Sequence, residues 1–165
     1  MKKYLLILGI LSMNVLASPL DNLSVYGGLG LGGKADSVKS NSMPVNVGAR
    51  YLYDVTTSIA VGPFVDYISE SKFDGGMKSS ALSYGVSGAY THQSGLYGIA
   101  SIGLNDVDSN LDGGIKNGMT IIGTLGYMIT PKIAVEGAYR NTSFKDNTSD
   151  KLDYSLFSLG AAYHF

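Results

Sequence analysis

From Leu23 onward, apolar and polar residues alternate with a period of two, and no long stretch has the spacing of an amphipathic helix. This alternation predicts β-strands whose two faces meet different surroundings. Eight such runs can be drawn. Each is close to the roughly 9–11 residues that a tilted membrane-spanning strand needs. The predicted strands are 23–33, 44–54, 58–68, 81–92, 95–105, 118–129, 132–142 and 153–165.

The connections between these runs alternate regularly in length. Long polar connections follow the first, third, fifth and seventh runs, and only two or three residues follow the others. In an antiparallel meander, this order places all long loops at one end and all tight turns at the other. Outer-membrane barrels have this layout, with short periplasmic turns and longer outer loops. The predicted fold is therefore all-β, an eight-stranded antiparallel up-and-down transmembrane β-barrel.

The residue types on the two faces indicate which face meets lipid, because a soluble eight-stranded barrel would alternate as well. All ten lysines lie outside the interiors of the predicted strands. One face consists of small residues that suit the cramped lumen of eight strands, so the large apolar residues of the other face are expected to meet lipid. The small-residue face comprises Gly28, Gly30, Gly32, Gly48, Ala60, Gly62, Gly85, Ser87, Ala89, Ala134 and Ala138.

Two strands are less regular. In the fifth, either Tyr97 and Ile99 or Leu96 and Ile102 could face lipid. In the third, Pro63 removes a hydrogen bond from the ladder, so a local bulge is expected there.

Four charged residues fall within strands on the inward parity: Arg50, Asp66, Glu136 and Arg140. Counted from the tight-turn end, Arg50 and Glu136 lie at one height, and the other two lie higher. Arginine and carboxylate form strong hydrogen-bonded ion pairs, and isolated charges in a dry lumen would be costly. We therefore expect two pairs that plug the lumen and fix strand register. The alternative interpretation is a gate or a narrow ion path.

The chain begins MKKYLLILGILSMNVLAS, with two lysines, a short apolar run and then small residues. This pattern is typical of a secretory signal peptide, and the run is too short to span a bilayer. The predicted organisation is a signal peptide at 1–17, cleaved after Ala17, and a barrel domain at 18–165. The predicted location is the cell outer membrane.

Composition argues against several kinds of chemistry. A net charge of −1 gives no basic footprint for nucleic acid. The absence of cysteine excludes disulfides and thiolate metal sites, and two histidines are too few for a histidine-rich site. The segment DSNLDG (108–113) fits the opening of a calcium loop, but Met119 stands where the bidentate glutamate belongs. Weak calcium contact there stays open, and no cofactor is expected.

The C-terminal part of the chain carries a family resemblance. The stretches GYMITPKIAVEGAYRNT (126–142) and SLGAAYHF (158–165) resemble the last hairpin of the OmpA transmembrane domain. The loop order and the terminal phenylalanine are also similar to OmpX, Ail and opacity-type surface proteins. The resemblance implies that the last strand is read by the outer-membrane assembly machinery, and that Arg50, Glu136 and Arg140 are counterparts of a lumen network. The assembly signal would comprise Phe157, Leu159, Ala161, Tyr163 and Phe165.

The expected function is that of a non-enzymatic, monomeric surface protein of the outer membrane, which contributes to envelope integrity and to adhesion-type contacts with a host or surface. Its other expected partners are outer-membrane lipid and lipopolysaccharide. Candidate contact residues are Phe73, Met77 and Phe144, apolar residues in polar loops that could instead pack onto the barrel rim. The loops mix lysines with acids and show no strong basic patch for heparin-like partners.

The alternative functions are a narrow ion-conducting pore and a lipid A-modifying barrel enzyme. For the enzyme, His92 and Ser94 are a candidate pair. They lie at a tight turn, away from the leaflet that would hold lipid A, and we expect no catalysis.

Overall fold

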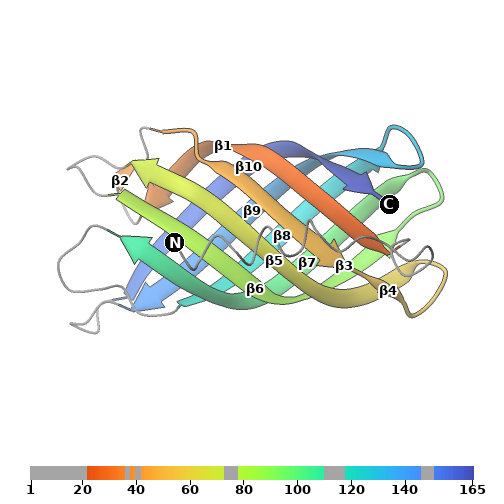
Figure 1. Ribbon diagram of the computed structural model, residues 1–165, viewed down its shortest axis with the longest axis horizontal. Coiled ribbons are helices and arrows are strands. Elements are labelled where there is room, and N and C mark those ends of the chain that lie inside the picture. Colours follow the sequence, from red (N-terminus) through yellow and green to blue (C-terminus); the bar gives the residue numbers. More distant parts are fainter. Residues whose placement is uncertain (1–21, 36–37, 40–41, 73–77, 110–117, 146–150) are drawn as a thin grey trace.

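The computed structural model describes residues 22–35, 38–39, 42–72, 78–109, 118–145 and 151–165, which form a closed antiparallel β-barrel (Figure 1). Within these residues, no helix is long and apolar enough to cross a membrane. The strands are β1 (Leu23–Ala35), β2 (Val38–Lys39), β3 (Val45–Tyr51), β4 (Tyr53–Asp54), β5 (Ile59–Lys72), β6 (Lys78–Thr91), β7 (Leu96–Ser109), β8 (Gly118–Met128), β9 (Ile133–Lys145) and β10 (Lys151–His164).

Eight antiparallel strands cross the barrel when β3 and β4 are counted as one strand and β2 is left out, which confirms the predicted fold class. Strand β4 continues β3 after Leu52, and β2 is a short partner of β1. Each of these eight strands pairs with the strands before and after it in sequence, and β10 pairs with β1 to close the sheet. The N–H of Phe165 donates to the carbonyl of Leu23 at 3.1 Å and completes this seam. A closed sheet leaves no unpaired edge between its first and last strands.

The two ends of the barrel differ as predicted, with the tight turns and the C-terminus together at one end (Figure 1). Two of the turns share one hydrogen-bond pattern. The Thr56 hydroxyl accepts the N–H of Ile59 at 3.0 Å, and the Thr130 hydroxyl accepts the N–H of Ile133 at 3.0 Å. The third turn needs Gly95, whose φ of 84° lies in the left-handed region. Threonine and glycine therefore fix the register of the hairpins.

The outer face of the barrel carries the large apolar side chains, as the alternation predicted. Leu29, Val86, Leu125 and Val135 are among the exposed residues on this face. In β7, Leu96 and Ile102 point outward, whereas Tyr97 is only 5% exposed and points into the lumen with Ile99. The facing that the alternation left open in the fifth strand is thereby settled.

The inner face differs from the prediction because it holds large side chains as well as small ones. Tyr26, Phe64, Ile122 and Leu156 belong to the inward parity. Tyr26 and Leu156 occupy the space above glycines on neighbouring strands, and Phe64 lies above Gly103 two strands away. A Cβ on Gly48, for example, would collide with the ring of Tyr26. The small residues thus make room for large ones across the lumen.

Two local irregularities also differ from the prediction. Gly32, expected in the lumen, lies at a bulge with φ of 72° and is exposed. Pro63 pairs with Val86 without a register shift, so the bulge expected at Pro63 is absent there. The bulge of this strand lies instead between Ile68 and Ser71.

Pro63 nevertheless affects the pairing of β5 on its other side, with β3 and β4. The ladder to the neighbouring wall is interrupted at Leu52, between β3 and β4. A proline has no N–H to donate to such a ladder. Pro63 therefore breaks the pairing without inserting a residue.

The seam between β1 and β10 depends on close backbone approach, and we predict that Gly160→Ala destabilises the barrel. Its Cβ would collide with the carbonyl oxygen of Gly27. Overpacking of this kind costs about 1–3 kcal/mol. Urea unfolding in detergent micelles measures the loss. Gly123→Ala is the matched control, because a Cβ at Gly123 meets nothing within 4 Å. Equal stability of the two variants would contradict the tight seam.

Candidate functional site: the charged lumen

The four charged residues of the strands all lie in the lumen. The side chains of Arg50, Asp66, Glu136 and Arg140 come from β3, β5 and β9 and are between 1% and 8% exposed as residues. The structure brings them together as two ion pairs, Arg50 with Glu136 and Arg140 with Asp66. These are the two pairings that strand parity and height suggested. Each positive charge is thus neutralised where water is scarce.

The pair nearer the tight turns is held by several neighbours. Arg50 Nη2 donates to Glu136 Oε1, and Arg50 Nε donates to the hydroxyl of Ser24 at 3.0 Å. The hydroxyl of Tyr97 donates to the same Glu136 oxygen at 2.5 Å. Arg50 Cζ lies 4.5 Å from the centroid of the Tyr26 ring, close enough for a cation–π contact. The guanidinium is therefore fixed from three directions.

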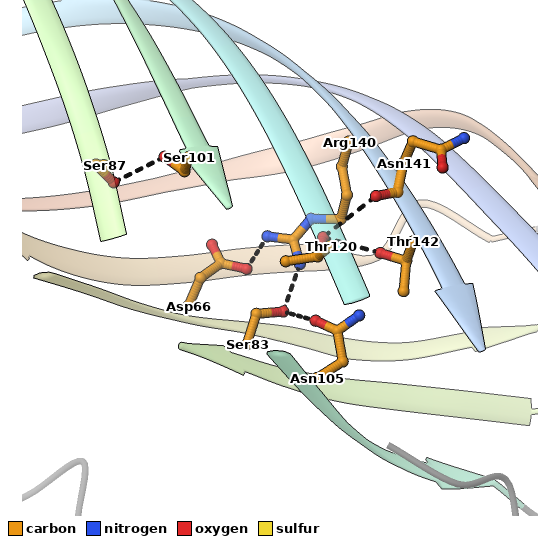
Figure 2. A network of polar contacts seen from close by, with 9 residues as sticks. All are labelled: Asp66, Ser83, Ser87, Ser101, Asn105, Thr120, Arg140, Asn141 and Thr142. Atoms are coloured by element: carbon orange, nitrogen blue, oxygen red, sulfur yellow. Dashed lines mark hydrogen bonds and ion pairs between the residues drawn. The ribbon is translucent and has the colours of Figure 1, made fainter. Parts of the chain in front are cut away.

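The second pair belongs to a longer network (Figure 2). Arg140 Nη2 donates to Asp66 Oδ1, and Arg140 Nη1 donates to the hydroxyl of Ser83 at 2.8 Å. Ser83 in turn donates to Asn105 Oδ1 at 2.5 Å. Figure 2 shows that Asp66 of β5 and Ser83 of β6 both contact the guanidinium of Arg140 from β9, and that Asn105 of β7 contacts Ser83. One arginine thus cross-links opposite walls of the barrel.

Hydroxyl pairs extend the polar lining beyond the arginines (Figure 2). The hydroxyls of Ser87 and Ser101 are 2.7 Å apart, and those of Thr120 and Thr142 are 3.0 Å apart. Each pair consists of directly opposed residues on neighbouring strands. The sequence analysis placed Ser87 on the inner face but missed Ser101, Thr120 and Thr142 and both hydroxyl pairs.

The space left in the lumen is small. A cavity of about 30 Å³, measured as the volume open to the centres of water-sized spheres, is lined by Arg50, Asp66, Glu136 and Arg140 together with glycine and serine. A single buried water needs about 10–15 Å³ on this measure. The cavity can hold only a few ordered waters between the two ion pairs.

The candidate pair His92 and Ser94 lies at a tight turn, outside the charged lumen. The Nδ1 of His92 lies 2.9 Å from the hydroxyl of Ser94 and 3.2 Å from its backbone nitrogen, so the ring caps its own turn. Among the residues that the structure describes, no group of three or more His, Cys, Asp or Glu side chains could hold a metal ion. Most of the possible calcium segment, at 110–113, lies outside the described residues.

The remaining candidates lie on the outer face or outside the described part. Residues of the expected assembly signal form one exposed stripe along β10 and the C-terminus. Phe73 and Met77 lie outside the described residues, as does the expected signal peptide at 1–17. Phe144 belongs to β9, but its side chain is outside the described set. The stripe comprises Phe157, Leu159, Ala161, Tyr163 and Phe165.

Comparison with known proteins identifies the class. The family model described as outer membrane protein beta-barrel domain matches residues 4–165, and the chain belongs to this family. No curated protein sequence matches the chain significantly.

Solved structures agree in fold. Neisserial surface protein A (NspA) has a TM-score of 0.59 at 20% identity, over 87% of this chain and 96% of its own. Ail, the attachment invasion locus protein of Yersinia pestis, crystallised with the heparin analogue sucrose octasulfate, has a TM-score of 0.52 at 15% identity and the same coverage. OprG of Pseudomonas aeruginosa has a TM-score of 0.51 at 12% identity, over 87% and 95%. At these identities the likeness shows the fold alone.

The ion pairs generate a prediction for stability. Arg50→Met leaves the Glu136 carboxylate buried without its cation, which should cost about 3–5 kcal/mol of unfolding free energy. The double variant Arg50→Met with Glu136→Leu removes both charges and should recover most of this loss. Urea unfolding in micelles measures both values, with Lys132→Met as the control because Lys132 is exposed. The pair would be irrelevant to stability if the single variant matched this control.

Proposed function

We propose that this chain is a non-enzymatic, non-conducting outer-membrane barrel that contributes to envelope integrity and makes adhesion-type contacts with a host or surface through its long loops. The observation that carries the first part is the filled lumen. Two buried ion pairs lie across it, and the cavity between them is about 30 Å³. A barrel with a filled lumen is a stable membrane-embedded structure and offers ions no open pore.

The lumen argues against the narrow pore for an energetic reason. An ion that passed would have to displace guanidinium groups that also bond hydroxyl groups of Ser24 and Ser83. Breaking a buried pair exposes two charges in surroundings of low dielectric constant. The charges therefore support a plug that also fixes strand register.

The lipid A-modifying enzyme receives no support from the tight turn that carries His92 and Ser94. The contacts between these two residues are local to the turn.

If the protein is non-enzymatic, lipid A mass spectra should stay unchanged when it is overproduced.

The surface role rests on the location of the long connections and on the class of protein. Ail, which shares the fold, is described as an attachment protein and was crystallised with a heparin analogue. By analogy with such barrels, the loop end faces outward and supplies the contacts. Residues 1–17 would direct export, and the outer stripe of β10 would be read by the assembly machinery. The remaining partners in this proposal are outer-membrane lipid and lipopolysaccharide, with the barrel as a monomer.

Planar-bilayer recording tests the plug. The parent barrel should show no steady conductance, whereas Glu136→Ala should open measurable events because it removes the carboxylate that holds Arg50 in place. Lys132→Ala, at the tight-turn end, is the control and should behave like the parent. Steady conductance of the parent would favour the pore instead.

A cell-binding assay tests the surface role. Cells that display the double variant Phe73→Ser with Phe144→Ser should adhere less than cells that display the parent, because two apolar contact groups are lost. A cell-surface stain for barrel abundance verifies that both proteins are folded and displayed equally. Undiminished adhesion would refute the assignment of these two residues, and cells with exchanged loops would then locate the true contacts.

A further inference from the structure

The pairing between β3 and β5 is short and interrupted. Strand β3 has 7 residues, whereas the other long strands of the barrel have 11–14. It pairs with β5 from Asn46 to Arg50, and after a gap the pairing resumes for the two residues of β4. The pairing of β6 with β7, by comparison, runs from Ser79 to Thr91 without a break. Few consecutive backbone hydrogen bonds therefore join β3 to β5.

At the tight-turn end of this interface, a backbone carbonyl has no ladder donor. The N–H of Leu52 donates to the carbonyl of Asn22 at 2.9 Å, so the backbone groups of Leu52 face β1. Successive residues of a strand direct these groups to opposite neighbours, so those of Tyr51 face β5. The register on both sides of the gap sets Tyr51 opposite Pro63, which has no N–H. The gap therefore follows from the proline.

At the loop end of the same interface, a side chain takes the place of a backbone acceptor. The N–H of Val45, the first residue of β3, donates to the hydroxyl of Ser69 at 2.8 Å. Strand β5 has its bulge at this height, between Ile68 and Ser71. The ladder between β3 and β5 is thus limited at both ends, and its middle block carries most of the attachment.

Both strands at this interface carry a charged residue that pairs across the lumen. Arg50 of β3 pairs with Glu136, and Asp66 of β5 pairs with Arg140 (Figure 2 shows the second pair). Both partners belong to β9. In the closed sheet, β1 and β10 separate β3 from β9, and β6, β7 and β8 separate β5 from β9. Strand β9 therefore holds both sides of the short interface from across the lumen.

The lumen cavity of about 30 Å³ lies against this interface. Its lining includes Asn46 and Arg50 of β3 and Asp66 of β5. The Oδ1 atom of Asn46 is buried and has no hydrogen-bond partner among the described residues. A buried acceptor without a donor adds a cost to the closed arrangement. Separation of β3 from β5 would remove that cost and join the cavity to the outside of the barrel.

We propose that the barrel wall opens between β3 and β5, and that the two cross-lumen ion pairs are the latch that keeps this interface closed. The short ladder supplies few hydrogen bonds, so β3 and β5 depend on Arg50 and Asp66 for part of their attachment. This role goes beyond that of a plug. A plug fills the lumen whichever strands carry it, whereas a latch has to join the strands of the weak interface.

Amide hydrogen exchange, measured residue by residue by NMR on the whole protein in micelles, tests the latch. The double variant Arg50→Met with Glu136→Leu removes one ion pair and leaves no unpaired charge. Exchange at Ala49 and Val65, which are opposed on β3 and β5, should accelerate about tenfold to a hundredfold. This is the range that loss of one charge-assisted hydrogen bond gives for local opening.

Two comparisons show whether the effect is local. Exchange at Ser101 and Ile122, which are opposed on β7 and β8, should keep the parental rate in the double variant. Thr120→Val with Thr142→Val is the matched control, because it removes a buried polar pair that joins β8 to β9 and touches neither β3 nor β5. Exchange at Ala49 should be the same in this control as in the parent.

The variant Pro63→Val tests the weak interface with the latch intact. It supplies an N–H opposite the carbonyl of Tyr51, so exchange at Ala49 and Val65 should become slower than in the parent. Introduced into the double variant, it should reverse part of the acceleration. An unchanged rate at Ala49 in Pro63→Val would overturn the weak interface, even if the double variant did not fold.

Two other results would overturn the latch itself. One is equal acceleration at Ser101 and Ala49, because the ion pair would then stabilise the whole barrel rather than one interface. The other is an unchanged rate at Ala49 and Val65 in the double variant. Adhesion and conductance play no part in these rates, so failure of the latch would leave the proposed surface role untouched.

Discussion

The whole structure depends on closure of the hydrogen-bonded sheet between β1 and β10. In a bilayer, an unpaired backbone N–H or carbonyl costs several kcal/mol, so a sheet can span lipid only if it has no open edge. The seam meets this requirement with paired glycines, Gly28 opposite Gly160, at a point of close backbone approach. Once the sheet is closed, its inner face must be filled from within. The large lumen side chains and the buried ion pairs together fill this inner face.

Strands β5 and β9 begin in the same way, which explains how Asp66 and Arg140 meet. The turn Val55–Ile59 and the turn 129–133 have the same threonine-capped hydrogen bonds, and each leads into the residues Ile-Ala-Val. Counted from these turns, Asp66 and Arg140 occupy the same position on β5 and β9. Inward side chains at matching heights on opposite walls reach toward the same point of the axis. Opposite charges at equivalent positions therefore make one ion pair.

The sequence was sufficient to predict the number of walls, the order of long and short connections, and the approximate heights of Arg50 and Glu136. The alternation along a strand predicts which side of the sheet a side chain lies on, but not how far it reaches. The contacts of Arg50 with Ser24 and Tyr26 therefore could not be predicted. Strand β7 was ambiguous because Tyr97 and Ile99 are as apolar as the outward residues beside them. The bulge at Gly32 escaped prediction because glycine also suits the lumen, and only φ distinguishes the two uses.

The charged side chains of this barrel follow two opposite rules, and the surroundings explain both. Within the wall, Arg140 is satisfied by Asp66 and Ser83, because a low dielectric constant makes an unpaired charge costly. At the tight-turn end of the wall, water screens charge, so Lys132 can lie exposed beside the ring of Tyr163. Charge that is neutralised within the lumen holds the protein together, whereas charge at the end of the wall is stabilised by water. The position of a charged residue along the barrel axis therefore decides whether it needs an ion-pair partner within the protein.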